Sequence, residues 1–182
     1  LMALLCSGKV YKIRLYQDGS GDATTSTSRW FGRFLTHLSG YPFEAVIPFF
    51  FIVLLKHNHL TILLCILLGV ALFSLFFVRN LFGWLWVIAI GVITITSLMN
   101  ASEPWVFSFV CLLIVNMMVE SIFSSVHICW KSIKYPKDAG DATLLAKTIK
   151  LPAFIWGILF LCFTTFIVVN SLPYLLQIKM PL

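Results

Sequence analysis

The sequence contains very little charge. Only 11% of its 182 residues are Asp, Glu, Lys or Arg, and 60% are hydrophobic, whereas an ordinary soluble domain has about 25% charged and about 45–50% apolar residues. This composition excludes a water-soluble globular domain. It also excludes intrinsic disorder, because a chain with 15% aromatic residues and so little charge cannot stay solvated as a coil. The sequence therefore predicts an integral membrane protein.

Paired cysteines and a basic surface are also missing. The five Cys residues include no Cys-x-x-Cys pair, and most lie in apolar runs, where Cys is commonly a small buried hydrophobe, so no disulfide framework is predicted. The net charge of +6 is spread over the gaps between the apolar runs. Because nucleic-acid binding needs one basic patch with interleaved aromatic residues, nucleic acid is excluded as a partner, and the lipid bilayer is the expected environment.

Five apolar runs have the composition of membrane-spanning helices, which need about 20 mainly apolar residues each. The gaps between them hold charged residues, Asn and Pro, as expected at a membrane surface. We predict one all-α integral membrane domain over residues 1–182 with about five transmembrane helices, and six in the whole protein. The predicted spans are 41–55, 60–78, 81–98, 105–128 and 151–169.

The basic residues predict the orientation of these spans. Two of them, Lys56 and Lys179, fall on one side, and all the others fall on the side that holds segment 1–40 and loop 129–150. Because Lys and Arg concentrate in cytoplasmic loops, segment 1–40 and loop 129–150 are both expected to be cytoplasmic. The residues on this side are Lys9, Lys12, Arg14, Arg29, Arg33, Arg79, Lys131, Lys134, Lys137, Lys147 and Lys150.

Segment 9–28 has a different pattern from the spans. Polar and apolar residues alternate from Lys9 to Tyr16, turn residues follow at Asp18–Gly21, and Thr and Ser are frequent after them. This pattern predicts a small cytoplasmic β-hairpin. The next segment, Trp30–Leu38, is expected to form a short amphipathic helix at the membrane interface, with its aromatic residues Trp30, Phe31 and Phe34 towards lipid.

The fourth predicted span carries a polar stripe. Asn116, Glu120, Ser124 and His127 are separated by four, four and three residues, a spacing that places them on one helix face. Carboxylates inside a membrane are costly and mark ion paths or proton relays, so Asn116 and Glu120 are candidates for an intramembrane polar path. The alternative is a packing stripe in which Glu120 reaches water or pairs with Lys131.

Several short phrases, in this order, resemble the M50B-like membrane metallopeptidases, which are relatives of site-2 proteases. Leu1–Val10 followed by Asp18–Gly21 is similar to the family's continuation after a helix that carries His-Glu-x-x-His, and Ser39–Tyr41 and Arg79–Gly83 resemble two further phrases. The resemblance covers about residues 1–160. Its last part, similar to a family pattern in order and spacing, consists of Asp141-Ala142, Leu145-Ala146, Pro152 and Trp156-Gly157.

The resemblance implies a zinc site that is held by two His and a third ligand, with a Glu as general base. No His-Glu-x-x-His occurs in these 182 residues, so no catalytic residue is assigned within them and this chain alone is not expected to bind zinc as the family does. The motif is expected immediately before Leu1, which stands inside an apolar phrase without an initiator Met. In site-2 proteases the third ligand is an Asp from a later segment, which implies Asp141, with Asp138 as the alternative.

Two functions remain open at this point. The first is an intramembrane zinc metallopeptidase, seen without its zinc-binding helix, that acts on a membrane protein or peptide. The second is a non-catalytic multispan protein, either a degenerate relative that serves as a scaffold or binding partner or a small transporter that uses Glu120.

Overall fold

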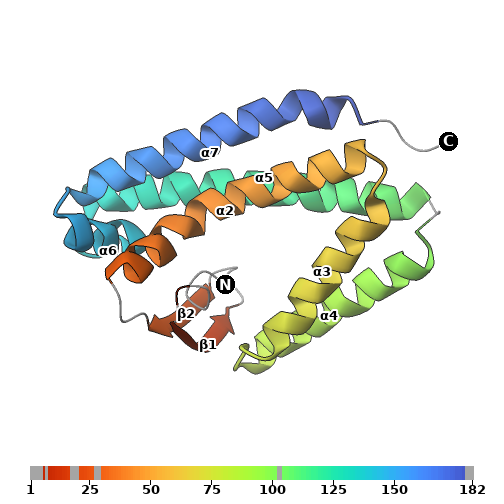
Figure 1. Cartoon of the computed structure of the whole chain (residues 1–182), viewed down its shortest axis with the longest axis horizontal. Coiled ribbons are helices and arrows are strands. Elements are labelled where there is room, and N and C mark those ends of the chain that lie inside the picture. The colour runs from red at the N-terminus through yellow and green to blue at the C-terminus, as the bar shows by residue number, and fades with distance from the viewer. Residues whose placement is uncertain (1–5, 7, 17–20, 27–29, 102–103, 179–182) are drawn as a thin grey trace.

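The computed structural model describes residues 6, 8–16, 21–26, 30–101 and 104–178. The described chain contains a two-stranded antiparallel sheet and six helices, and Figure 1 shows α2, α5 and α7 running along one another while α3 and α4 form a separate pair. The prediction of an all-α membrane protein with a small β-hairpin is confirmed. The elements are β1 (Lys9–Leu15), β2 (Gly21–Ser26), α2 (Trp30–Lys56), α3 (Leu60–Leu75), α4 (Leu81–Met99), α5 (Pro104–Lys134), α6 (Gly140–Ile149) and α7 (Ala153–Leu176).

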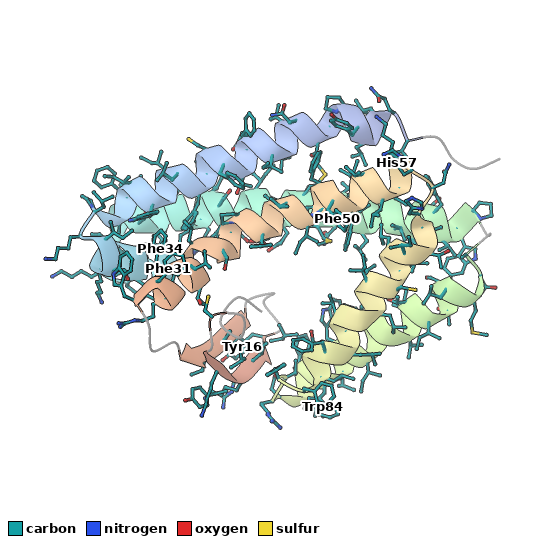
Figure 2. The ribbon with its side chains drawn as sticks, viewed as in Figure 1. Tyr16, Phe31, Phe34, Phe50, His57 and Trp84 are labelled. Atoms are coloured by element: carbon teal, nitrogen blue, oxygen red, sulfur yellow. The ribbon has the colours of Figure 1, made fainter. Side chains whose placement is uncertain are left out.

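Four of the described helices, α2, α4, α5 and α7, are long and apolar enough to cross a membrane. Figure 2 shows aromatic side chains standing outward from such helices, including Phe50 on α2 and Trp84 on α4, which are both exposed. An apolar surface this extensive is typical of a protein that is surrounded by lipid. The structure therefore agrees with a multi-pass membrane protein.

Helix α3 is shorter than the other apolar helices. Its 16 residues span about 24 Å at a rise of 1.5 Å per residue, less than the bilayer's hydrocarbon core of about 30 Å. The helix ends at Leu75 because the next residues bond to the β-hairpin: the Ile13 amide donates to the Phe77 carbonyl (2.8 Å), and the Arg79 amide donates to the Ile13 carbonyl (3.0 Å).

Helix α2 is continuous from Trp30 to Lys56, so the expectation of a separate interfacial helix before the first span is wrong. The prolines inside α2 do not end it, because proline keeps a helical φ and neighbouring helices compensate for the lost hydrogen bond. The expected lipid-facing position of Phe34 is also wrong. Its ring is partly buried and meets the ring of Trp156 on α7 edge-on, with 6.1 Å between the centroids.

The buried core has one part at each end of the α2–α5–α7 bundle. Near the α2–α3 turn, Ile52 of α2, Leu63 of α3 and Val110 of α5 are fully buried. Towards the other end, Leu145 of α6 packs with Trp156 of α7 and with side chains of α5. Because α6 is held by this second cluster, the first residues of α6 have a fixed position against α2 and α5.

The β-hairpin docks on the turn between α3 and α4. Besides the backbone bonds of Ile13, the Asn80 side chain binds both backbone groups of Leu15: its Nδ2 donates to the Leu15 carbonyl (2.6 Å), and its Oδ1 accepts from the Leu15 amide (3.2 Å). The hairpin turn that was expected at Asp18–Gly21 lies mostly outside the described residues. One edge of β1 is therefore covered by the α3–α4 turn.

We expect Asn80→Ala to loosen the hairpin, because it removes two hydrogen bonds that are worth about 1 kcal/mol each. Hydrogen exchange of the Leu15 amide should become faster by about tenfold or more. Asn100→Ala is the matched control, since Asn100 follows the last residue of the same helix and, among the described residues, its side chain bonds the Thr96 carbonyl of that helix. Equal exchange of Leu15 in the wild type and in Asn80→Ala would show that the contact does not hold the hairpin.

Candidate functional site

A groove of about 1220 Å³ lies between α2, α5 and the start of α6, and we call it the α2–α5 groove. Figure 1 shows α6 beside the N-terminal part of α2 and the C-terminal end of α5. The wall is a mixture of acidic, polar and large apolar side chains. The lining residues are Gly21, Gly40, Tyr41, Phe43, Glu44, Ile47, Glu120, Phe123, Ser124, Val126, His127, Trp130 and Asp141.

The polar side chains of the groove come from helix faces with a regular spacing. On α2, Tyr41 and Glu44 are three residues apart, and on α5, Glu120, Ser124 and His127 are separated by four and three residues, so each set lies on one face. Since α2 and α5 pack against each other, the two faces border the same space. They meet where the Ser124 hydroxyl donates a hydrogen bond to Glu44 Oε1 at 3.0 Å.

Asp141 closes the end of the groove. It stands in the first turn of α6, where a carboxylate is favoured by the helix dipole. The preceding loop is held by Thr143, whose hydroxyl accepts from the Ala139 amide (2.8 Å) and donates to the Pro136 carbonyl (2.9 Å). Gly140 adopts a left-handed φ of 51° that favours glycine, directly before Asp141.

Helix α2 holds the Asp141 carboxylate from the other side. His37 Nδ1 lies 2.8 Å from Asp141 Oδ1, and the two side chains are 20% and 36% exposed. One turn further along α2, Gly40 lies beside the second oxygen, since a β-carbon at position 40 would stand 3.4 Å from Asp141 Oδ2, about van der Waals contact. The carboxylate is therefore oriented by α2 while it remains accessible from the groove.

Asp138, the alternative to Asp141, has different surroundings. Its side chain is 90% exposed and lies 3.7 Å from Lys131 Nζ, the geometry of a solvated surface ion pair. It is not among the residues that line the α2–α5 groove. Of the two aspartates, the structure brings Asp141 to the groove and leaves Asp138 at the surface.

The polar stripe of α5 is only partly in the groove. Glu120 lines it, together with Ser124 and His127, whereas Asn116 is exposed and is not among the lining residues. A four-residue step turns a side chain about 40° around the helix axis, so the stripe has rotated out of the groove by Asn116. The alternative pairing of Glu120 with Lys131 has little support, because the two are about 16 Å apart along the helix and Lys131 lies beside Asp138.

Two residues of the site were not expected from the sequence. Glu44 is a carboxylate within the first predicted span, 41–55, and could have been recognised by the same reasoning as Glu120. The sequence predicts His37 to lie in a separate interfacial helix, Trp30–Leu38, which hides its helical spacing to Tyr41 and Glu44. The continuity of α2 is what puts His37, Tyr41 and Glu44 on one helix.

The fit of this site to a zinc ion is incomplete. Within the described part of the chain, no group of three or more His, Cys, Asp or Glu side chains could hold a metal ion. His37 and Asp141 bring two donors together, whereas a catalytic zinc takes three protein ligands and a water. The described residues therefore do not form a zinc site by themselves.

Comparison with known proteins identifies the family. Residues 1–171 match the family described as Peptidase M50B-like. No curated protein and no solved structure matches the chain. The family match covers nearly the whole chain and includes the hairpin, all the described helices that border the groove, and Asp141. This chain belongs to the Peptidase M50B-like family.

Proposed function

We propose that this chain forms the groove and one zinc ligand, Asp141, of an intramembrane metallopeptidase, and that a segment outside these 182 residues carries the zinc-binding His-Glu-x-x-His. The observation that carries the proposal is the Asp141 carboxylate, which α2 orients through His37 at the end of a groove. In such enzymes the zinc ion polarises the substrate carbonyl and activates a water for attack.

The chain's own residues would position the third ligand. Carboxylates that bind a metal are commonly oriented by a further hydrogen bond, and His37 supplies one to Asp141 Oδ1. The Asp141 side chain stays 36% exposed, so its carboxylate remains accessible to a metal ion. His37 is thus proposed as a positioning residue and Asp141 as a ligand.

Polar side chains in the groove would bring water to this end of the bundle. Glu44, Ser124 and Glu120 line it along α2 and α5, within segments that the sequence predicts to span the membrane. Hydrolysis inside a bilayer requires such a route, because the hydrocarbon region itself contains no water. Glu44 replaces Asn116 in the polar path that was predicted from the sequence.

We place the Asp141 end of the bundle on the cytoplasmic side. Loop 129–150 carries five of the 13 basic residues and the segment before α2 carries several more, and basic residues concentrate in cytoplasmic loops. The Trp30 indole donates to the Thr148 carbonyl at 3.1 Å, so the start of α2 and the end of α6 lie at one end of the molecule. The proposed substrate is a membrane protein or a membrane-embedded peptide.

Removal of metal from the full-length protein tests this function. We expect the purified protein to contain about one zinc per molecule, and a chelator to abolish cleavage of a membrane-embedded peptide. Zinc should restore cleavage, whereas Mg²⁺, which prefers six oxygen ligands, should not. Bound zinc is measured by elemental analysis, and cleavage by mass spectrometry of the products.

Three results would contradict the peptidase proposal. The full-length coding sequence could lack His-Glu-x-x-His, the purified protein could contain no zinc, or cleavage could persist without metal. Absence of both zinc and cleavage would favour the non-catalytic alternative, a scaffold or a transporter in which Glu120 acts.

A further inference from the structure

The α2–α5 groove has an excess of negative charge. Three carboxylates line it, Glu44, Glu120 and Asp141, and no Lys or Arg is found among the described residues of its wall. Glu44 accepts a hydrogen bond from the neutral hydroxyl of Ser124, and Glu120 has an exposed side chain. The groove therefore offers two carboxylates, Glu44 and Glu120, to whatever occupies it.

The two lysines at the C-terminal end of α5 contact side chains other than Glu44 and Glu120. Lys131 lies beside Asp138. Lys134 lies over the rings of Trp130 and Tyr135, 4.8 Å and 5.5 Å from the two centroids. The bases at this end of α5 are thus engaged with partners other than Glu44 and Glu120.

The remainder of the wall is apolar and aromatic. Phe43 and Ile47 of α2 and Phe123 and Val126 of α5 line the groove, and all four are exposed large hydrophobic residues. Glu120 lies eight residues before the end of the predicted span 105–128, which is about 12 Å from that end along the helix. Carboxylates at such a depth are costly unless a partner of opposite charge or water is present.

We propose that the α2–α5 groove binds a membrane-embedded peptide segment that is apolar except for one Lys or Arg, whose charge pairs with Glu44 and Glu120. This class of peptide follows from charge complementarity and from the apolar wall. Calling the peptide a substrate rests on the proposed peptidase function. Glu44 is one helical turn from Gly40, where an added β-carbon would stand 3.4 Å from Asp141 Oδ2. Measured along α2, the basic residue would therefore lie about 6 Å from the position beside Asp141. This distance corresponds to about two residues of an extended peptide.

The proposal is tested by peptide binding to the full-length protein in nanodiscs of uncharged lipid. Three fluorescent single-span peptides of Leu and Ala are compared: one with a Lys near the end that reaches Glu44 and Glu120, one with Gln at that position, and one with the Lys near the opposite end. We expect the first to bind about tenfold more tightly than the other two, as a charge pair at a recognition site affords.

Variants assign this preference to the two carboxylates. The double substitution Glu44→Gln and Glu120→Gln keeps the side-chain shapes and an acceptor for Ser124, and it should bring the Lys and Gln peptides to equal affinity. Asp138→Asn removes a carboxylate outside the groove and should leave the tenfold preference intact. Thermal unfolding in the same nanodiscs verifies that each variant is folded.

Failure of this proposal is distinguishable from failure of the peptidase function. Equal affinity for the Lys and Gln peptides in the wild type, or a Lys preference that survives in the double variant, overturns the proposed recognition even if the protein contains zinc and cleaves. A Lys preference in a protein without zinc or cleavage supports the binding site while it contradicts the peptidase function.

Discussion

Replacing Asp141 by Asn in the full-length protein is expected to lower its zinc affinity by more than about 100-fold. Removing a residue that hydrogen-bonds a metal ligand typically lowers metal affinity about 10–100-fold. Removing a charged ligand itself should lower the affinity more. The amide of Asn has the same size as the carboxylate, so the packing beside Gly40 is preserved. Bound zinc is measured by elemental analysis after dialysis against a series of zinc buffers.

Asp138→Asn is the matched control for this experiment. It makes the same chemical change three residues earlier, at a side chain that is 90% exposed, and we expect its zinc affinity to equal that of the wild type. Unchanged affinity in Asp141→Asn would refute Asp141 as the third ligand. Loss of zinc in Asp138→Asn alone would assign that role to Asp138 and would mean that loop 136–140 moves when the metal binds.

The second large effect is expected for stability, at a tight contact between α5 and α7. Gly157 of α7 lies against α5 so tightly that a β-carbon at this position would overlap Ser132 Oγ and stand only 3.0 Å from Cys129 Cα. The Ser132 hydroxyl cannot easily move away, because it donates to the Cys129 carbonyl at 2.7 Å. Small residues allow such close helix contacts in membrane proteins.

We therefore expect Gly157→Ala to destabilise the protein by about 2 kcal/mol, within the range of about 1–3 kcal/mol for added volume in a packed core. Unfolding in detergent micelles, monitored by circular dichroism, measures the change. Gly69→Ala on α3 is the control, since nothing lies within 4 Å of a β-carbon there. This control should be neutral or stabilising by up to about 1 kcal/mol, because Ala favours the helix over Gly.

A second substitution checks the cause of the destabilisation. Ser132→Gly removes the side chain that the new β-carbon would overlap, and in combination with Gly157→Ala it should recover part of the lost stability, since neighbouring substitutions are coupled. The backbone of Cys129 still limits the recovery. Equal stability of Gly157→Ala and Gly69→Ala would contradict the close contact between α5 and α7.

Several phrases of the family resemblance have a packing role in the structure. Asn80 binds the β-hairpin, and a β-carbon on Gly83 would stand 2.7 Å from Asn80 Oδ1. Leu145 and Trp156 belong to the cluster that holds α6. These residues therefore hold the β-hairpin and α6, the helix that carries Asp141, in place.

The sequence predicted helices more accurately than it predicted their ends. It separated Trp30–Leu38 from the first span, 41–55, because Pro42 stands at the start of that span. In the structure α2 is continuous, and the packing of Phe34 on Trp156 supports one helix. It extended the second span to Val78, whereas α3 ends at Leu75. Hydropathy carries no information about the hydrogen bonds between residues 77–79 and the distant strand β1. In both segments a tertiary contact determined the boundary.

By itself the sequence determined the membrane environment, the helical class, the hairpin and the family resemblance, because these depend on composition and on patterns between near neighbours. Only the tertiary structure decided which polar residues come together in the α2–α5 groove. His37 and Asp141 are 104 residues apart and Glu44 and Ser124 are 80 residues apart, so their pairing depends on how α2, α5 and α6 pack. The choice between Asp141 and Asp138 has the same physical reason, since three residues of chain separate a side chain held by α2 from one in solvent.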